Sequence, residues 1–250
     1  RRHQILWLAR YRPAAAEVGG HGHGTAVAIP LDMIERKENE TQNQAEARVT
    51  RSLTGSKCGR VTAVRTLVGG KPVKLVSAYA PSKGVHRPAF FRNSLDPHLT
   101  KNTVLSIDAN CVPDVVLDTQ RPSAVGEYDN RGAGDLADVL RKHELSDVAR
   151  EQLGSSKLFT AHHVNVHHQI TRTRIDQLYA PNLDGMLWTH KTNHSLLPAR
   201  TGLPDHVGLE LNLELARGER GKDLARINPR VYEDPTTHSL LEECIDTHFS

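Results

Sequence analysis

An acidic residue and a histidine, Asp205 and His206, stand side by side at the start of an apolar run that ends at Leu215. A carboxylate is a ligand that Mg²⁺ accepts, and an imidazolium can hold a phosphate. Every second residue of the run is Val or Leu, which is the period of a half-buried strand. The pair therefore predicts a metal and phosphate site at a strand mouth, although such a pair alone is also typical of a solvated strand start.

Three further polar clusters lie at the ends of apolar runs. Asp108 and Asn110 follow the run 103–107, Asp176 lies in the triplet Arg-Ile-Asp, and Tyr79 ends the run that begins at residue 73. Phosphodiester hydrolysis needs an activated water, a cation that takes up charge, and donors to the non-bridging oxygens. Asp108 can polarise the water while Asn110 orients it, Asp176 can pair with the histidine, and Tyr79 can donate its phenol. The sequence thus predicts one site assembled from distant strand ends.

Each cluster also has a simpler interpretation. Asp108-Ala-Asn110 suits a turn, and Arg174 with Asp176 suits a cross-strand charge pair. Tyr79 suits the rim of a core with its hydroxyl at the surface. In the functional interpretation Arg174, Asn110 and Tyr79 contact the substrate. The histidines between residues 162 and 168 indicate a histidine-rich turn, since a zinc site requires third and fourth ligands at a defined geometry.

The elements that must position these residues follow from hydrophobic period and turn signals. In the first half the sequence predicts a strand at 24–30, a polar loop with some helix at 32–58, a hairpin of strands 59–67 and 73–79, a helix at 86–99 broken at Pro97, and a strand at 103–107. In the second half it predicts a helix at 134–143, a strand pair 158–160 and 173–179, an ambiguous segment 187–197 and a strand at 207–215. A linker at 217–223 and a short helix at 237–247 follow. This order predicts an α+β fold of two packed, mostly antiparallel sheets flanked by helices.

Composition narrows the class of protein. With 250 residues the chain fits one large domain, or one domain and a tail, and its formal charge of +3 is compatible with a polyanionic partner. No apolar run reaches the roughly 20 residues that a membrane-spanning helix needs, so no membrane association is expected. The three cysteines form no CxxC pair, which favours a reducing compartment, the nucleus or the cytoplasm.

Four motifs occur in an order and spacing that resemble the endonuclease/exonuclease/phosphatase superfamily: Ser77–Pro81, Ser106–Asn110, Thr173–Tyr179 and Leu203–His206. The similarity covers roughly residues 20–216. Within the superfamily the chain looks most like the apurinic-type endonuclease domain of LINE-type (non-LTR) retrotransposon polyproteins. The Leu145–Arg150 stretch, Phe159-Thr160 and the Arg-Ile-Asp triplet carry this finer resemblance.

The resemblance implies a four-layer α/β sandwich and a role for each matched residue. Asp205 and Asp108 would bind Mg²⁺, with Mn²⁺ as an alternative ion. His206 would contact the phosphate and be oriented by Asp176. Asp108 and Asn110 would also position the attacking water, and Tyr79 would contact the phosphate or the nucleophile.

The same resemblance implies an organisation and a partner. Residues 1–216 would be the endonuclease domain and residues 217–250 a linker toward a reverse transcriptase region, because 226–235 resembles the segment that precedes the polymerase in such polyproteins. DNA would be the substrate, and the cut would prime reverse transcription.

One departure from the family bears on activity. The family begins with a strand bearing Asn and then a Gln-Glu pair whose glutamate binds magnesium, whereas Glu17 is the only acidic residue before the strand at 24–30. We therefore expect an N-terminally truncated domain that lacks its first strands and binds metal weakly. Three hypotheses remain open: a DNA-nicking endonuclease, another phosphatase or phosphodiesterase of the superfamily, and an inactive remnant that binds nucleic acid.

Overall fold

The computed structural model describes residues 5–12, 23–122, 127–164, 169–181, 186–193 and 206–215. The chain divides into two units, Arg1–Ala216 and Arg217–Ser250, and every described residue belongs to the first. The predicted linker at 217–223 and helix at 237–247 lie outside the described residues. No helix in the described ranges has the length and apolar character that would let it cross a bilayer.

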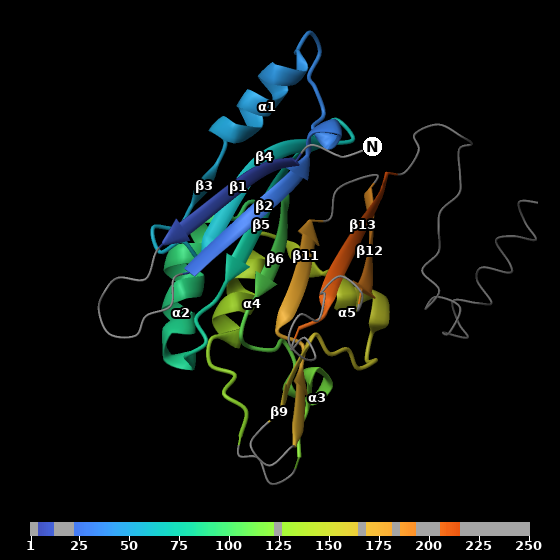
Figure 1. The fold of residues 1–250 in the computed structure, drawn as a ribbon. Helices are drawn as coiled ribbons and strands as arrows, with labels where there is room; N and C mark the ends of the chain where they lie inside the picture. The colour runs from blue at the N-terminus through green and yellow to red at the C-terminus, as the bar shows by residue number, and fades with distance from the viewer. Residues whose placement is uncertain are drawn as a thin grey trace, which may run out of the picture. The chain divides into compact units, whose positions relative to one another are not determined.

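A six-stranded sheet forms the centre of the molecule (Figure 1). Its order is β3 (Thr54–Gly55), β4 (Val61–Val68), β5 (Lys71–Tyr79), β6 (Thr103–Asp108), β11 (Asp176–Pro181) and β8 (Leu145–Asp147). The pair β5–β6 is parallel and the other pairs are antiparallel. The predicted α+β class with mostly antiparallel strands is therefore confirmed.

The predicted hairpin is the pair β4–β5. Its turn consists of Gly69 and Gly70, whose φ angles of 58° and 74° are the left-handed values that a tight two-residue hairpin turn requires. The carboxylate of Glu35 accepts hydrogen bonds from both glycine N–H groups. The turn chemistry that the sequence predicted thus sets the register of the two longest central strands.

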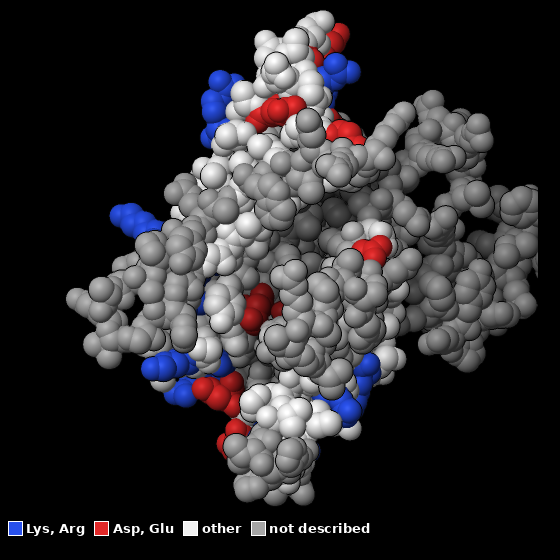
Figure 2. All heavy atoms as spheres, viewed as in Figure 1, with Lys and Arg blue, Asp and Glu red and all other residues white. Residues whose placement is uncertain are grey.

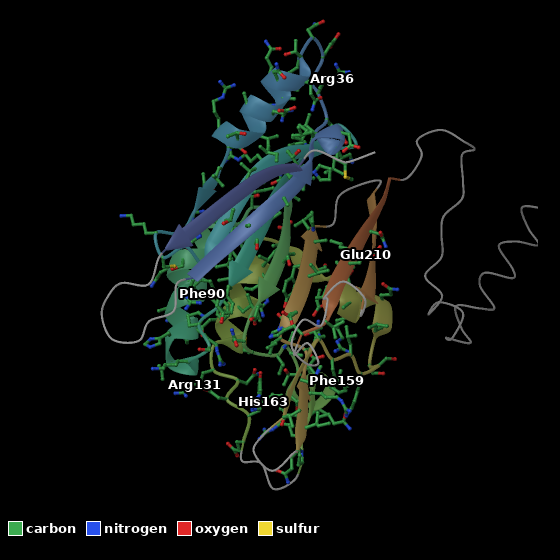
Figure 3. The ribbon with its side chains drawn as sticks, in the orientation of Figure 1. Arg36, Phe90, Arg131, Phe159, His163 and Glu210 are labelled. Carbon is green, nitrogen blue, oxygen red and sulfur yellow. The ribbon has the colours of Figure 1, made fainter. Side chains whose placement is uncertain are left out.

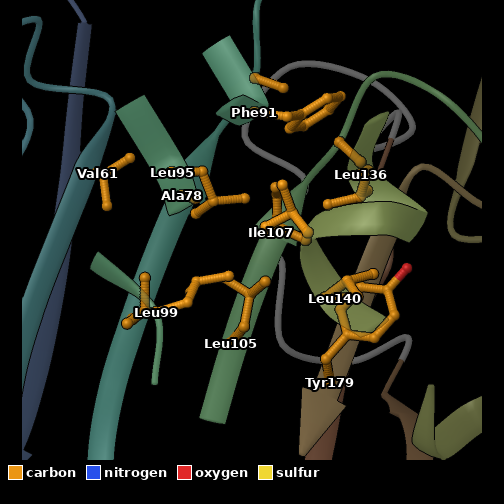
Figure 4. Close-up of a cluster of buried hydrophobic side chains, with 14 of the residues drawn as sticks. Val61, Ala78, Phe91, Leu95, Leu99, Leu105, Ile107, Leu136, Leu140 and Tyr179 are labelled. Carbon is orange, nitrogen blue, oxygen red and sulfur yellow. The ribbon is translucent and has the colours of Figure 1, made fainter. Parts of the chain in front are cut away.

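Helices cover one face of the central sheet. The 3₁₀ turn Gly84–His86, α2 (Arg87–Phe90), the π-helical turn Phe91–Leu95 and the 3₁₀ turn Asp96–His98 follow one another without a break, and the run ends just after Pro97 as predicted. The predicted helix at 134–143 is α4 (Ala133–Lys142), which buries Leu136, Val139 and Leu140. Figure 4 shows these helices packing on Ile107 and its neighbours, which form the main hydrophobic core.

Strands and one helix cover part of the opposite face. Val64 and Leu75 point away from the main core because side chains alternate along a strand. They pack on the antiparallel pair β1 (Ile5–Arg12) and β2 (His23–Pro30) and on α1 (Gln42–Arg51), which a capping box at Thr41 begins. The predicted strand at 24–30 is β2. The expectation that no strand precedes it is wrong, because β1 does so and pairs with β2 along its whole length.

A second antiparallel pair, β12 (Met186–Asn193) and β13 (Gly208–Leu215), contacts α5 (Val148–Leu153) and β11. The predicted strand at 207–215 is β13, and the ambiguous segment 187–197 contains β12. The structure confirms the strict Val/Leu alternation as a strand. Between residues 208 and 212, however, the leucines and the polar residues are buried to the same intermediate degree, so period alone did not set burial here.

The remaining described strands form a three-stranded sheet of β7 (Thr119–Gln120), β10 (Ile170–Thr173) and β9 (Ala161–Val164). Two short helical elements are also present, α3 (Val115–Asp118) and the 3₁₀ turn Leu31–Met33. The predicted strand pair of 158–160 with 173–179 is present with other bounds: β9 pairs with β10, and the Thr160 N–H donates to the Thr173 carbonyl. The chain leaves this sheet at Arg174 and enters the central sheet as β11, so residues 176–179 pair elsewhere. No Gly or Pro in 173–179 marks this change of sheet.

Candidate active site

Three of the predicted residues form a row across the central sheet. Asp108 is the register partner of Tyr79 on β5 and of Asp176 on β11. Residues paired directly across neighbouring strands project from the same face of a sheet. Ile107, the chain neighbour of Asp108, lies in the main core, so the row faces away from α2 and α4. Residues from three separate strands therefore share one side of the sheet, as predicted.

His206 completes the cluster. Its Nδ1 lies 2.8 Å from Oδ2 of Asp176, and ligand atoms of Asp108, Asp176 and His206 all lie within 4.8 Å of one another. The side chains of His206 and Asp176 are 35% and 21% exposed, so the cluster is open to solvent. In Figure 2 acidic atoms lie in a hollow near the centre of the visible face. The predicted pairing of Asp176 with His206 is present.

Thr160 connects the strand of Asp176 to the segment of His206. Its hydroxyl accepts the backbone N–H of Asp176 at 3.0 Å, and its carbonyl accepts the N–H of Val207 at 2.7 Å. An isolated bridge between Ala161 and His206 extends this contact. Thr160 is fully buried, so these bonds are shielded from water. Sequence reasoning missed this role, because only the tertiary structure reveals the two partners of Thr160.

The carboxyl group of Asp108 has a raised pKa. Burial, and then the nearby Asp176 carboxylate, raise its pKa from 3.8 to about 6. Its Oδ1 accepts the N–H of Asn110, whose φ of 49° is left-handed, and Asn110 Nδ2 donates to the Ala80 carbonyl. The segment Asp108-Ala-Asn110 thus forms the turn that its residue types favour, and the Asp108 carboxylate at its start lies beside Asp176 and His206.

Tyr79 lies beside an arginine that the sequence analysis did not single out. The guanidinium carbon of Arg60 is 4.9 Å from the centre of the Tyr79 ring, and Arg60 Nη1 donates to the Tyr79 carbonyl at 3.2 Å. A cation over an aromatic face attracts the ring. Arg60 therefore fixes the ring at one end of the row.

The prediction that Arg174 contacts substrate is wrong. Its side chain is 1% exposed, and its guanidinium bonds both oxygens of Asp118 and both oxygens of Asp147. Arg150 adds a further ion pair to Asp118, which is fully buried. Burial opposes the charge on Arg174, but the bonds to the two carboxylates outweigh it and raise its pKa. Arg174 thus anchors the junction between β10 and β11 instead of facing a ligand.

The donor set suits a hard divalent cation. Mg²⁺ keeps several waters and needs only one or two carboxylates, which Asp108 and Asp176 offer at short range. Asp205, which the sequence predicted as a metal ligand together with Asp108, lies outside the described residues. The strand β1 contains no acidic residue, so it offers no carboxylate of the kind that the family places before β2.

A cavity of about 340 Å³ adjoins the cluster. Asn110 and His206 line it, together with Tyr128, His163 and Thr171. Arg87 also lines the cavity, but its guanidinium donates to four backbone carbonyls, which makes it a structural residue. The cluster therefore stands at the side of a polar groove large enough for part of a substrate.

Several solved structures are similar to this chain in fold. An AP endonuclease from Archaeoglobus fulgidus matches with a TM-score of 0.52 and 14% identity over 85% of this chain and 80% of its own. D. rerio TDP2 complexed with single-strand DNA product matches with a TM-score of 0.51 and 13% identity over 84% and 77%. The chain has the endonuclease/exonuclease/phosphatase fold. The endonuclease domain of TRAS1, a telomere-specific non-LTR retrotransposon, is also similar, at a TM-score of 0.48 and 16% identity over 83% and 80%.

No protein-family model and no curated protein matches the sequence. The chain thus shares its fold with these structures at low sequence identity, and Asp108, Asp176 and His206 lie together in it.

Proposed function

We propose that this protein hydrolyses phosphodiester bonds of DNA with the help of a divalent cation, making single-strand nicks. The observation that carries the proposal is the convergence of Asp108, Asp176 and His206, from separate segments, beside a polar groove. Two carboxylates and an imidazole supply the groups that phosphodiester hydrolysis requires. The similarity in fold to DNA-processing enzymes supports DNA as the substrate class.

In this proposal the His206–Asp176 pair holds the phosphate. Oδ2 of Asp176 accepts a hydrogen bond from Nδ1–H of His206, which fixes the ring orientation and sets a negative charge beside an imidazolium. The other ring nitrogen, Nε2, would then donate to a non-bridging oxygen of the scissile phosphate. Charge that develops on that oxygen in the transition state is stabilised by a donor that is already oriented.

Asp108 would act on the attacking water. A carboxyl whose pKa is about 6 is mostly ionised at neutral pH and can act as a base, and its pKa lies closer to neutrality than that of an ordinary Asp, which favours proton transfer. Asn110, held by the Ala80 carbonyl, would orient the same water. Asp108, Asp176 and Asp205 are the residues that would hold Mg²⁺ or Mn²⁺, which when bound would withdraw charge from the phosphate and the leaving oxygen.

The test is nicking of supercoiled plasmid in the presence of Mg²⁺. We expect conversion to the open circle by the wild-type protein, and a loss of about 10²- to 10⁴-fold in Asp108→Asn and His206→Ala. Arg36→Gln, a change of an exposed side chain far along the chain, serves as the matched control and retains activity. Equal nicking by all four preparations would indicate a contaminating nuclease and remove the proposed site.

A second function is favoured by one observation, the absence of acidic residues from β1. If Asp205 and Asp108 do not bind metal tightly enough, the domain would bind nucleic acid without cutting it. Wild-type protein that binds DNA but nicks neither with Mg²⁺ nor with Mn²⁺ at millimolar concentration would support this alternative.

The finer role is a proposal of its own. We infer from the motifs at 145–150, 159–160 and 226–235 that the domain belongs to a LINE-type retroelement, with residues 217–250 leading toward a reverse transcriptase in cis. Under this proposal the nick would leave a 3′ hydroxyl that can prime DNA synthesis. Primer extension on nicked plasmid by an added polymerase tests the end chemistry, and a 3′ phosphate would contradict it.

A further inference from the structure

A second cavity, of about 390 Å³, lies next to the catalytic groove and has no role in the mechanism above. Its wall includes Lys157, Phe159, His162 and Arg172. Ala161 and His162 line both this cavity and the catalytic groove, so the two cavities adjoin. The volume lies at the lower end of the roughly 300–1,000 Å³ range of ligand pockets.

The lining has the chemistry of an anion site. Lys157 and Arg172 are exposed cations, His162 is half-buried, and no Asp or Glu is among the described residues that form the wall. The backbone register sets Arg172 directly opposite His162 on β9 and opposite Gln120 on β7. Gln120 Oε1 accepts a hydrogen bond from Arg172 Nη1 at 3.0 Å, which holds the guanidinium in place. The positive charge is thus partly pre-oriented.

An aromatic side chain stands in the same wall. Phe159 is half-buried, so part of it faces the cavity beside the cations. Figure 3 places it at the same end of the molecule as His163 and at the opposite end from Arg36. An aromatic face next to Lys and Arg is the arrangement that binds the base and the phosphate of an unpaired nucleotide.

The backbone connects this cavity to the catalytic cluster. Val207, which also lines the cavity, follows His206 directly, and its N–H donates to the carbonyl of Thr160, the residue after Phe159. Ala161 forms an isolated bridge to His206. A strand whose scissile phosphate lies at His206 would therefore pass the cavity within a short stretch of nucleotides.

We propose that this cavity binds one nucleotide of the cleaved DNA strand beside the scissile bond, with its phosphate on Lys157 and Arg172 and its base against Phe159. The inference rests on the proposed function and names a subsite of it. Two contributions to DNA affinity are then expected from this cavity. The charge contribution depends on salt, and the stacking contribution depends on the presence of a base.

The charge contribution is tested by measuring DNA binding by fluorescence anisotropy, in EDTA so that no cleavage occurs. The double variant Lys157→Gln/Arg172→Gln is compared with Arg36→Gln/Arg51→Gln, which removes the same charge from exposed side chains elsewhere. The slope of log Kd against log salt should fall by about 0.9 on duplex DNA, or about 0.7 on a single strand, for each phosphate that the variant no longer neutralises. The control double variant should keep the wild-type slope. Equal slopes in the two double variants would overturn the proposal.

The stacking contribution is tested with oligonucleotides in which each base in turn is replaced by an abasic site. Wild-type protein should lose about 5- to 100-fold in affinity at one position beside the nick, and Phe159→Leu should be insensitive there. No sensitive position in the wild-type protein would contradict the subsite. Should the wild-type protein bind DNA with these signatures but fail to nick, the subsite stands and the proposed hydrolysis fails. Should it nick normally while the cavity variants bind like wild type, the subsite fails alone.

Discussion

Two groups of charged side chains, one around Arg174 and one around Asp108, differ in their balance of positive and negative charge, although Arg174 and Asp176 are only two residues apart. Around Arg174 two arginines face two carboxylates, and each carboxylate bonds at least one guanidinium. Around Asp108 two carboxylates share a single imidazole. In the second group, burial and a like charge raise the pKa of Asp108 to about 6. The first group is balanced, whereas the second keeps uncompensated negative charge.

The difference separates scaffold from site. Removing one partner from a buried network of paired charges is strongly destabilising, so this network fixes the junction where the chain passes from β10 to β11. Uncompensated acids beside a groove destabilise the fold but are ready to bind a cation or accept a proton. Asp176 connects the two groups, since it lies two residues after Arg174 and forms part of the cluster with Asp108 and His206.

The largest effect is expected from Arg174→Met. The change leaves the fully buried Asp118 with only Arg150 as an ion-pair partner, and it should lower the free energy of unfolding by about 3–5 kcal/mol. Urea denaturation at neutral pH measures this. A loss below about 1 kcal/mol would mean that the network does not anchor the junction, and the comparison would fail.

Asp108→Asn should raise the free energy of unfolding at neutral pH, whereas Arg174→Met lowers it. The folded-state pKa of Asp108 is about 6 and its ordinary value is 3.8, so the folded protein holds this proton more tightly than the unfolded chain. The free energy of unfolding of the metal-free wild type should therefore fall between about pH 4 and pH 6, by at most about 3 kcal/mol, and stay low above pH 6.

In Asp108→Asn that portion of the pH dependence should be absent, and the variant should be more stable than wild type above pH 6 although it does not nick DNA. Denaturation in EDTA from pH 4 to pH 8 checks both points. Parallel stability profiles for the two proteins would show that Asp108 carries no uncompensated charge.

Thr160→Val tests whether the residue that links Asp176 to the segment of His206 affects both stability and activity. Removing the hydroxyl leaves the N–H of Asp176 without its acceptor in a buried position, which should cost about 1–3 kcal/mol of stability. The activity per folded molecule should also fall, because Asp176 orients His206. Thr160→Ser, which keeps the acceptor, is the control and should restore nicking. Wild-type activity in the valine variant would show that Thr160 serves stability alone.

The smallest effect on stability is expected from Arg172→Gln. Arg172 is exposed and its guanidinium donates to the neutral side chain of Gln120, so the free energy of unfolding should change by less than about 0.5 kcal/mol. Thermal denaturation beside Arg174→Met gives a direct comparison of two arginines two residues apart. A large loss of stability in Arg172→Gln would mean that exposure does not separate them.

Local patterns predicted the elements whose signal lies within a few residues. The Gly69-Gly70 turn, the strands beside it and the apolar stripe of α4 were all identified, because turn chemistry and period act over short distances. β1 was missed, and the strands around Arg174 were predicted with other bounds. In that stretch one uninterrupted segment, without a Gly or Pro between its two strands, serves two different sheets, which period cannot reveal.

The sequence by itself determined which chemical groups stand at strand ends, and therefore that acids, a histidine and a tyrosine could form one site. Only the tertiary structure decided which of them meet. Register placed Tyr79, Asp108 and Asp176 in one row, and the Thr160 contacts brought His206 to Asp176. Burial then turned Arg174 into an anchor, because a charge removed from water must find opposite charges within the fold. Such partners are selected by packing between distant segments, and no local pattern records them.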